Sequence, residues 1–171
     1  MSPQSGSYRP DRLDRALLTA LEEHPRAGDL ELSRITQVAR ATVQSRLARM
    51  SDAGVIAGWG PTVDVAAAGF AVQAFVSLEI AQVALEDLRA ELEANPHVLE
   101  AYTTTGTSDA LCKVAARSHE ELQEVLLALT RSPVVVRSTS VVALTVLVPR
   151  RTAPLLATAE DERGPRAPAY R

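Results

Sequence analysis

Cysteine, aromatic residues and histidine are scarce in this sequence. Cys112 is the only cysteine among 171 residues, so an internal disulfide is excluded, which fits a reducing compartment. Cys112 lies in an apolar stretch, which favours a buried, unreactive thiol. Aromatic residues make up only 4% of the chain, so a core must come from the leucine, valine and alanine in its 46% hydrophobic content. The three histidines stand apart, and none has a partner at metal-ligand spacing.

Long apolar segments are also missing. No stretch of about 18 residues is free of charged or polar interruption, and the first ten residues hold no apolar run of the signal-peptide type. We therefore expect a cytoplasmic protein without a membrane span. The chain also lacks a Ser/His/Asp set, a metal-ligand cluster and a glycine-rich nucleotide loop. Accordingly, we expect no catalytic residues, no metal and no cofactor.

Charge is distributed unevenly along the chain. The formal net charge is −3, so the chain as a whole lacks the positive charge that is typical of nucleic-acid-binding proteins. Residues 1–60 carry eight Lys/Arg against seven Asp/Glu, whereas residues 61–150 carry six against eleven. Between Glu31 and Asp52 there are four arginines and no acid. This pattern predicts a local basic surface on an acidic body.

Two short helices joined by a tight turn are predicted over residues 30–56. Val43, Leu47 and Met50 recur at i, i+4 and i+7, which gives the second helix one apolar stripe. Its opposite face is small or hydrogen-bonding, and such a helix with basic surroundings suits entry into a DNA major groove. The alternative is a helical hairpin whose arginines only solvate a surface. The expected DNA-binding residues are Arg34, Arg40, Thr42, Gln44, Ser45, Arg46 and Arg49.

Three of these residues have distinct expected roles. Gln44 faces outward and can bond adenine bidentately, and Arg40 at the helix start can bond guanine. Arg46 lies nearer the apolar stripe, which favours phosphate positioning.

Flanking residues set the limits of these helices. Asp11 and Asp29 are the expected N-caps of a preceding amphipathic helix and of the first hairpin helix. Gly54 is the expected left-handed C-terminal cap. A wing strand is expected to begin near Val55. Three helices and a wing predict a winged helix-turn-helix domain over residues 11–60.

The second half of the chain changes to the order βαββαβ. Residues 71–81 alternate between apolar and polar side chains, and residues 134–148 form a long β-branched last strand. The order predicts a ferredoxin-like sheet over residues 71–149, with both helices on one face. The fold class is therefore α+β, with a linker at residues 61–70. Residues 150–171 are rich in Pro, Ala, Arg and Glu and are expected to form an unstructured tail.

The second face of the expected sheet is too apolar for open water. It carries Phe75, Leu111 or Cys112, and parts of the last strand. A bare face of this kind indicates a partner, because soluble monomers rarely expose large apolar patches.

Several short motifs follow one another in a recognisable order and spacing. They are Leu13-Asp14-Arg15-Ala16-Leu17-Leu18, Leu30-Glu31-Leu32-Ser33, Arg46-Leu47, Met50, Ala53-Gly54-Val55-Ile56-Ala57-Gly58 and Thr105-Gly106-Thr107-Ser108-Asp109-Ala110-Leu111. Across residues 11–150 they resemble the Lrp/AsnC (feast/famine) family of bacterial transcription regulators. The resemblance implies a homodimer of sheets packed face to face, and further assembly up to a tetramer of dimers. Where the family usually has Gly and then a Ser cap between the hairpin helices, this chain has Gln37 and Ala39.

A loop dense in hydroxyl groups is the expected effector site. Its residues are Thr104, Thr105, Gly106, Thr107 and Asp109. Backbone N–H groups and Thr hydroxyls can bind the carboxylate of an amino acid, and Asp109 can accept from its ammonium group. Gly106 lets a ligand approach the backbone closely. The alternative is that Thr and Asp only shape the turn, which is their commonest role.

The resemblance also bears on the expected effector. The family often has a second acid and an aromatic residue in this loop, where the present chain has Thr107 and Ala110. A small or apolar amino acid is therefore expected rather than a large polar one.

The expected function is that of a sequence-specific DNA-binding transcriptional regulator. A small effector, by resemblance an amino acid, would modulate its assembly or its affinity for double-stranded DNA. One alternative is an effector-independent DNA-binding architectural protein. Another is an enzyme similar to haem-biosynthesis decarboxylases, which share this body plan. That enzyme would need a basic pocket for a polycarboxylate, for which Lys113 and Arg137 are the main candidates.

Overall fold

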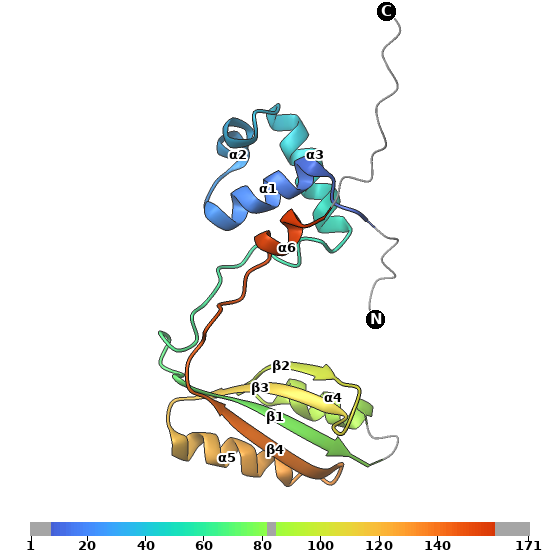
Figure 1. Cartoon of the computed structure of the whole chain (residues 1–171), viewed down its shortest axis with the longest axis vertical. Coiled ribbons are helices and arrows are strands. Elements are labelled where there is room, and N and C mark those ends of the chain that lie inside the picture. The colour runs from blue at the N-terminus through green and yellow to red at the C-terminus, as the bar shows by residue number, and fades with distance from the viewer. Residues whose placement is uncertain (1–7, 82–84, 160–171) are drawn as a thin grey trace, which may run out of the picture. The chain divides into compact units, whose positions relative to one another are not determined.

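The computed structural model describes residues 8–81 and 85–159. The chain divides into two compact units (Figure 1). Unit 1 holds Met1–Pro61 and Pro149–Arg171, and unit 2 holds Thr62–Val148. The chain therefore passes from one unit to the other twice. None of the helices in the described residues is both long and apolar enough to cross a membrane.

Unit 1 is built on three helices whose apolar sides face one another. They are α1 (Arg12–Glu23), α2 (Asp29–Thr36) and α3 (Arg40–Asp52). The buried core comprises Leu17, Ala20, Leu32, Val43, Leu47 and Met50. The predicted apolar stripe of α3 is thus confirmed, and it docks α3 onto the two preceding helices.

The helix ends follow the predictions with one exception. Asp11 caps α1: its carboxylate accepts from the backbone N–H groups of Leu13 and Asp14, and the Asp14 carboxylate accepts from the N–H of Asp11. The N-cap of α2 is Gly28, and Asp29 is the first helical residue, so the prediction for Asp29 is wrong by one position. The Asp29 carboxylate instead contacts α3.

The turn between α2 and α3 keeps a left-handed residue without using glycine. Gln37 ends α2 with φ 55° and ψ 37°. Ala39 precedes α3 in an extended conformation and supplies no side-chain cap. The helix-turn-helix geometry is therefore formed although a bulky residue stands at the position where left-handed backbone favours glycine.

The expected wing is absent from the described part of unit 1. The backbone N–H groups of Val55 and Ile56 both donate to the carbonyl of Met50, at 2.9 and 3.2 Å, and so close the end of α3 around Gly54 (φ +71°). No strand is found between α3 and β1. A strand needs a second strand to pair with, and the described residues of unit 1 contain none.

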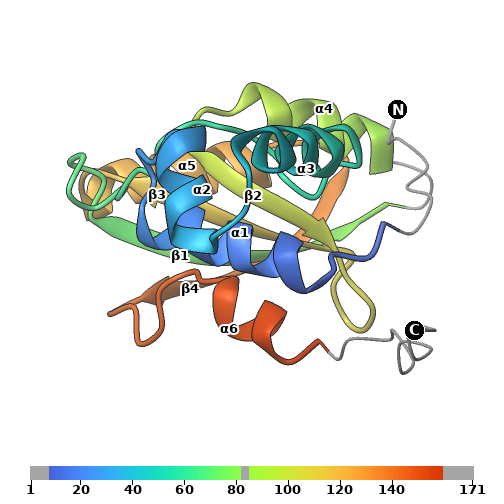
Figure 2. The same cartoon turned by 90° about the horizontal axis from the view of Figure 1, so that it is seen from above.

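The C-terminal segment is not wholly the unstructured tail that the sequence predicts. The helix α6 (Ala153–Ala157), red in Figures 1 and 2, packs against α1. The carboxylate of Glu22 accepts from the backbone N–H groups of Thr152 and Ala153, at 3.3 and 2.9 Å. A carboxylate at the start of a helix satisfies N–H groups that have no partner within the helix. Residues 160–171 lie outside the described part.

Unit 2 has the predicted βαββαβ order. Its elements are β1 (Val72–Ile80), α4 (Leu85–Ala94), β2 (Val98–Thr103), β3 (Ala110–Ala116), α5 (His119–Thr130) and β4 (Val135–Ala143). The four strands form one antiparallel sheet in the order β2-β3-β1-β4. This is the ferredoxin-like arrangement that the sequence predicts.

Both helices of unit 2 cover one face of the sheet, as Figure 2 shows. Residues of β1 and β3 that point to this inner face, such as Val76 and Cys112, are buried against leucines of α4 and α5. Cys112 is therefore an inner residue, and Leu111 belongs to the other face. Cys112 is fully buried, as predicted, and burial raises the pKa of its thiol to about 11.

The last strand is shorter than predicted. β4 ends at Ala143, opposite Gln73, because β1 begins only one residue earlier, at Val72. The following apolar residues extend beyond the sheet, and Leu144 and Leu147 are 95% and 89% exposed.

Candidate functional site

The outward face of α3 is polar and open to solvent. Arg40, Gln44, Ser45 and Arg49 are exposed on it, and Arg34 of α2 is also exposed. The apolar stripe on the opposite side is buried, which fixes the outward face in place. Thr42 is half-buried. The structure therefore presents five of the seven expected DNA-binding residues on the surface of the helix-turn-helix.

One carboxylate connects the two helices of this motif. The side-chain amide of Gln44 donates from Nε2 to Oδ2 of Asp29, at 2.7 Å. The Nε of Arg40 lies 3.9 Å from the same oxygen. Asp29 thus contacts the two residues of α3 for which the sequence predicts contacts with bases.

Arg46 lies close to the apolar stripe, as predicted, and joins an ion-pair network there. Its Nη1 donates to Oδ2 of Asp11 at 2.6 Å and to Oδ1 of Asp14 at 3.0 Å. Asp14 is fully buried, and the Arg46 side chain is only 22% exposed. Arg46 therefore neutralises a buried carboxylate between α1 and α3, a structural role that the sequence does not predict. Two neighbouring carboxylates, first Asp11 by its hydrogen bond, raise the pKa of Arg46.

Tyr8 links Arg49 to this ion-pair network. Arg49 donates from Nη2 to the Tyr8 hydroxyl at 3.2 Å, and its guanidinium lies 5.2 Å from the centre of the Tyr8 ring. The Tyr8 hydroxyl donates to Asp14 at 2.9 Å. Burial, and next the hydrogen bond to Asp14, raise the pKa of Tyr8. Sequence reasoning missed Tyr8 because Tyr8 lies before the first predicted helix and belongs to no motif.

The expected effector residues form a tight loop between β2 and β3. The hydroxyl of Thr104 donates to the carbonyl of Ser108 at 2.7 Å, and Gly106 has φ +124°. Oδ2 of Asp109 accepts from the backbone N–H of Ile80 at 2.8 Å. Thr104 and Asp109 therefore help to hold the loop, whereas Thr105, Gly106 and Thr107 lie exposed at its tip.

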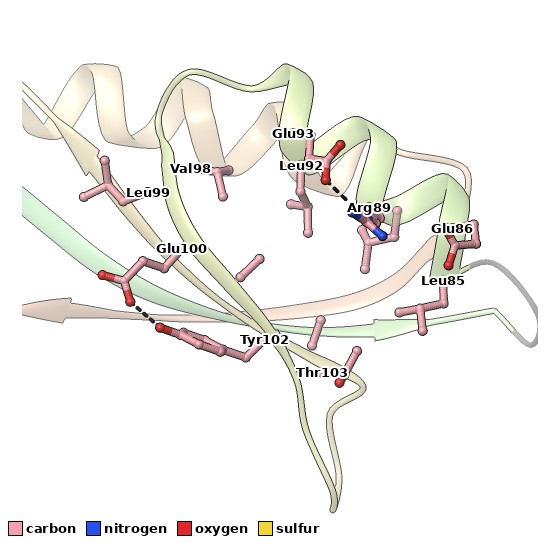
Figure 3. A pocket seen from close by; sticks show the side chains of 13 residues that line it. Leu85, Glu86, Arg89, Leu92, Glu93, Val98, Leu99, Glu100, Tyr102 and Thr103 are labelled. Atoms are coloured by element: carbon pink, nitrogen blue, oxygen red, sulfur yellow. Dashed lines mark hydrogen bonds and ion pairs between the residues drawn. The ribbon is translucent and has the colours of Figure 1, made fainter. Parts of the chain in front are cut away.

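A hollow of about 530 Å³ lies between α4 and β2 (Figure 3). Its wall is apolar at Leu85, Leu92 and Val98. Its rim carries Arg89, which donates to Glu93 at 2.9 Å, and Glu100, which accepts from the Tyr102 hydroxyl. The hollow also reaches Thr103 and Ala110, the residues where the effector loop begins and ends. No motif in the sequence predicts this hollow, because it forms only where a helix packs beside the edge of a strand.

The two basic residues considered for a decarboxylase pocket do not converge. Lys113 lies on β3 between Phe75 and Glu100 in the neighbouring strands. Arg137 lies on β4, and its Nη1 is 3.8 Å from Glu79. Each has an acid beside it or opposite it, and neither lines the hollow between α4 and β2.

Sequence comparison matches both parts of the chain to known domain families. Residues 11–51 match the AsnC-type helix-turn-helix domain, and residues 73–153 match the Lrp/AsnC ligand binding domain. The HTH-type transcriptional regulator Rv2324 of Mycobacterium tuberculosis is 36% identical to this chain over 143 residues. That alignment covers 83% of this chain and 97% of the relative.

Solved structures share the fold. AsnC of Escherichia coli superposes with a TM-score of 0.79 at 30% sequence identity, covering 86% of this chain and 100% of that chain. A transcriptional regulator from Neisseria meningitidis, solved as a complex with L-Met, superposes with a TM-score of 0.75 at 24% identity. The superposition covers 81% of this chain and 92% of that chain. At this sequence identity, it shows a shared fold and nothing more.

Proposed function

Because the chain belongs to the Lrp/AsnC family of transcription regulators, we propose that it binds its operator by inserting the outward face of α3 into the major groove. The observation that carries this proposal is the exposed polar face of α3, fixed from behind by a buried apolar stripe. Members of this family are DNA-binding regulators and not enzymes. This regulator works where DNA is found, in the cytoplasm.

The surface residues have separate roles in this proposal. Gln44 and Arg40, in the first half of α3, contact base edges, and Ser45 lies beside them. Arg34 and Arg49 contact phosphates. The first turn of α3 contains no acid and has no side-chain cap, which leaves backbone N–H groups available to a phosphate.

A binding titration tests this assignment. A preferred site is first selected from random duplexes, and the triple variant Arg34→Ala, Arg40→Ala, Arg49→Ala is then titrated with it. We expect at least a 100-fold loss of affinity and a smaller salt dependence, since each lost phosphate contact lowers the slope by about 0.9. The matched control removes three exposed arginines of unit 2, Arg89, Arg117 and Arg131, and should bind like the wild type. Wild-type affinity in the first triple variant would exclude α3 as the DNA-binding element.

The outer face of the sheet, opposite α4 and α5, is the proposed homodimer interface. Phe75, Tyr102 and Val141 lie on this face and are 43%, 57% and 63% exposed. Phe75 and Val141 are cross-strand partners, so they form one apolar patch. A second copy would bury the patch, and a tetramer of such dimers is the further assembly proposed. Two copies of the helix-turn-helix, related by the symmetry of the dimer, would make the operator a pseudo-palindrome.

The proposed effector is an amino acid at the loop between β2 and β3. Thr105 and Thr107 bind its carboxylate together with the loop backbone at Gly106, and Asp109 accepts from its ammonium group. The adjacent hollow, with its apolar wall, accommodates a small or apolar side chain. That a regulator of the same fold was solved with L-Met supports this class of ligand. By favouring one assembly, the ligand would shift DNA affinity, by no more than its differential affinity for the two states.

Calorimetric titration with the proteinogenic amino acids tests the effector site. At least one of them should bind the wild type, and Asp109→Asn should bind it at least tenfold more weakly. The asparagine keeps an oxygen that can accept from the N–H of Ile80, so the variant removes charge while preserving the loop. Glu79→Gln is the matched control, because it removes a charge from β1, the strand to which Asp109 is hydrogen-bonded. If no amino acid binds, or if Asp109→Asn binds as the wild type does, the loop is only a turn.

A further inference from the structure

The carboxylate of Asp29 contacts two side chains of α3, Gln44 and Arg40. We infer that Asp29 is a positioning residue for DNA recognition. It fixes the orientation of the Gln44 amide and thereby determines which base Gln44 recognises. This inference rests on the proposed major-groove binding of α3. It concerns a carboxylate that no DNA-binding motif in the sequence singles out.

The position of Asp29 supports a role outside its own helix. Asp29 is the first residue of α2, but the N-cap there is Gly28, and no side-chain hydrogen bond caps the helix. Its side chain is 30% exposed, and its Oδ2 is the shared contact of Gln44 at 2.7 Å and Arg40 at 3.9 Å. The carboxylate is thus directed at the two proposed base-contacting residues of α3.

Hydrogen-bond chemistry then fixes the Gln44 amide. A carboxylate can only accept, so the amide nitrogen of Gln44 must face Asp29 and the amide oxygen must face away. One N–H is held by Asp29, which leaves the oxygen and the second N–H for a base. That pair is the donor and acceptor set that matches N7 and N6 of adenine. A freely rotating amide would lose side-chain entropy on binding and could present its two ends in either order.

The charge of Asp29 adds discrimination. Guanine presents two acceptors in the major groove, and a carboxylate near that edge is repelled by both. Phosphates are repelled as well, so Asp29 lowers affinity for DNA in general while it disfavours the wrong base. The Arg40 contact is made through Nε, so the terminal nitrogens of Arg40 can still reach DNA.

The experiment compares base preference in four proteins at the selected site: wild type, Gln44→Ala, Asp29→Asn and Glu31→Gln. Glu31 is the matched control because it lies in the same first turn, is exposed, and makes no ion pair or side-chain hydrogen bond within the described residues. Competition with single base-pair substitutions first locates the pair whose preference Gln44→Ala abolishes. Wild-type discrimination there should be about 5- to 150-fold, as for one bidentate contact.

Asp29→Asn should lose most of that discrimination at the same base pair and leave the other positions unchanged, because asparagine can accept or donate and no longer dictates the amide orientation. Both Asp29→Asn and Glu31→Gln should bind nonspecific DNA somewhat more tightly, since each removes one negative charge. In a Gln44→Ala background, Asp29→Asn should change no base preference further. A merely structural role would instead lower affinity at all positions together.

Several outcomes would overturn the inference. The inference fails if Asp29→Asn retains full discrimination, if Glu31→Gln loses it equally, or if Gln44→Ala leaves every preference intact. In these three cases the wild type still binds DNA through α3, and only the role of Asp29 fails. If the triple arginine variant binds as the wild type does, the proposed DNA-binding surface itself fails, and that titration detects it independently.

Discussion

Arg46 is the residue whose removal should affect the helix-turn-helix most. It is the cationic partner of Asp14, which is fully buried, and it also binds Asp11. Replacing Arg46 with Met would leave a buried carboxylate without its cation, although Tyr8 still donates to it. We expect a loss of about 3 kcal/mol in the free energy of unfolding of unit 1, measured by urea denaturation. Arg49→Met, which removes an exposed cation from the same helix, should cost less than about 1 kcal/mol. A similar loss in both variants would contradict the role given to Arg46.

The same network predicts how acid affects unit 1. Partial burial raises the pKa of Asp11, but hydrogen bonds from Arg46 and from the backbone of Asp14 and Leu13 outweigh it and leave the pKa below its ordinary value of 3.8. A carboxyl group with a lowered pKa stabilises the folded state above pH 3.8, and this contribution disappears as the pH falls through the lowered value. Unfolding measured from pH 6 down to pH 2 should show this loss in the wild type and a smaller one in Arg46→Met.

A single substitution at Gln37 should make unit 1 more stable. It is a side-chain-bearing residue at φ 55°, where glycine has no steric cost. Gln37→Gly should raise the free energy of unfolding of unit 1 by about 0.5–1 kcal/mol, less the chain entropy that glycine adds to the unfolded state. Gln37→Ala keeps the steric cost and serves as the control. If both variants have equal stability, the left-handed backbone at this residue carries no strain.

Among the elements, the sheet has the clearest unpartnered surface. Phe75→Asp places a charge at the centre of the outer face, beside Val141 on the neighbouring strand. If this face is the dimer interface, the variant should be a monomer of 18.3 kDa by light scattering at micromolar concentration. Leu127→Asp, at an exposed position of α5 with 46% accessibility, should keep the wild-type mass. A wild-type monomer, or a Phe75→Asp protein with wild-type mass, would rule out this interface.

The sequence predicted the elements that local patterns determine. The α3 stripe, the alternation in β1 and the cap at Asp11 depend on neighbours a few residues away, and all are present. The wing and α6 depend on partners: the wing lacks a strand to pair with, and α6 starts at a carboxylate 131 residues away from Ala153. Local sequence patterns do not predict contacts between residues so far apart in the chain.

The same distinction separates the site residues. Outward positions such as Gln44 and Ser45 follow from helical period, and they are exposed as predicted. The place of Arg46 depends on Asp11 and Asp14, 35 and 32 residues earlier, and that of Asp109 depends on Ile80, 29 residues earlier. A charge with a buried partner and a charge facing solvent look alike in a sequence, so these roles became visible only in the folded chain.

At the scale of the whole molecule, unit 1 is discontinuous in sequence. α6 returns to α1 only after the chain has passed through all of unit 2. The contact between Glu22 and Thr152 spans 130 residues, which would be a long loop to close in a disordered chain. Folding of unit 2 shortens this loop, because Gln73 and Ala143 become neighbours in adjacent strands. Because the loop is shortened to about half its length, loop-closure entropy alone favours the docking of α6 by about 0.7 kcal/mol.

Chain entropy therefore couples the folding of the two units. During synthesis, α6 can dock only after β4 has been made. Unit 1 is therefore completed last, although its three main helices are synthesised first. Leu78→Ala, which opens a cavity in the core of unit 2, should destabilise that unit by about 2–5 kcal/mol. Hydrogen exchange at the amide of Leu156, in α6, should then accelerate in urea at the concentration that unfolds the sheet, while the amides of α3 remain protected. The end of the chain would thus report on whether the sheet is folded.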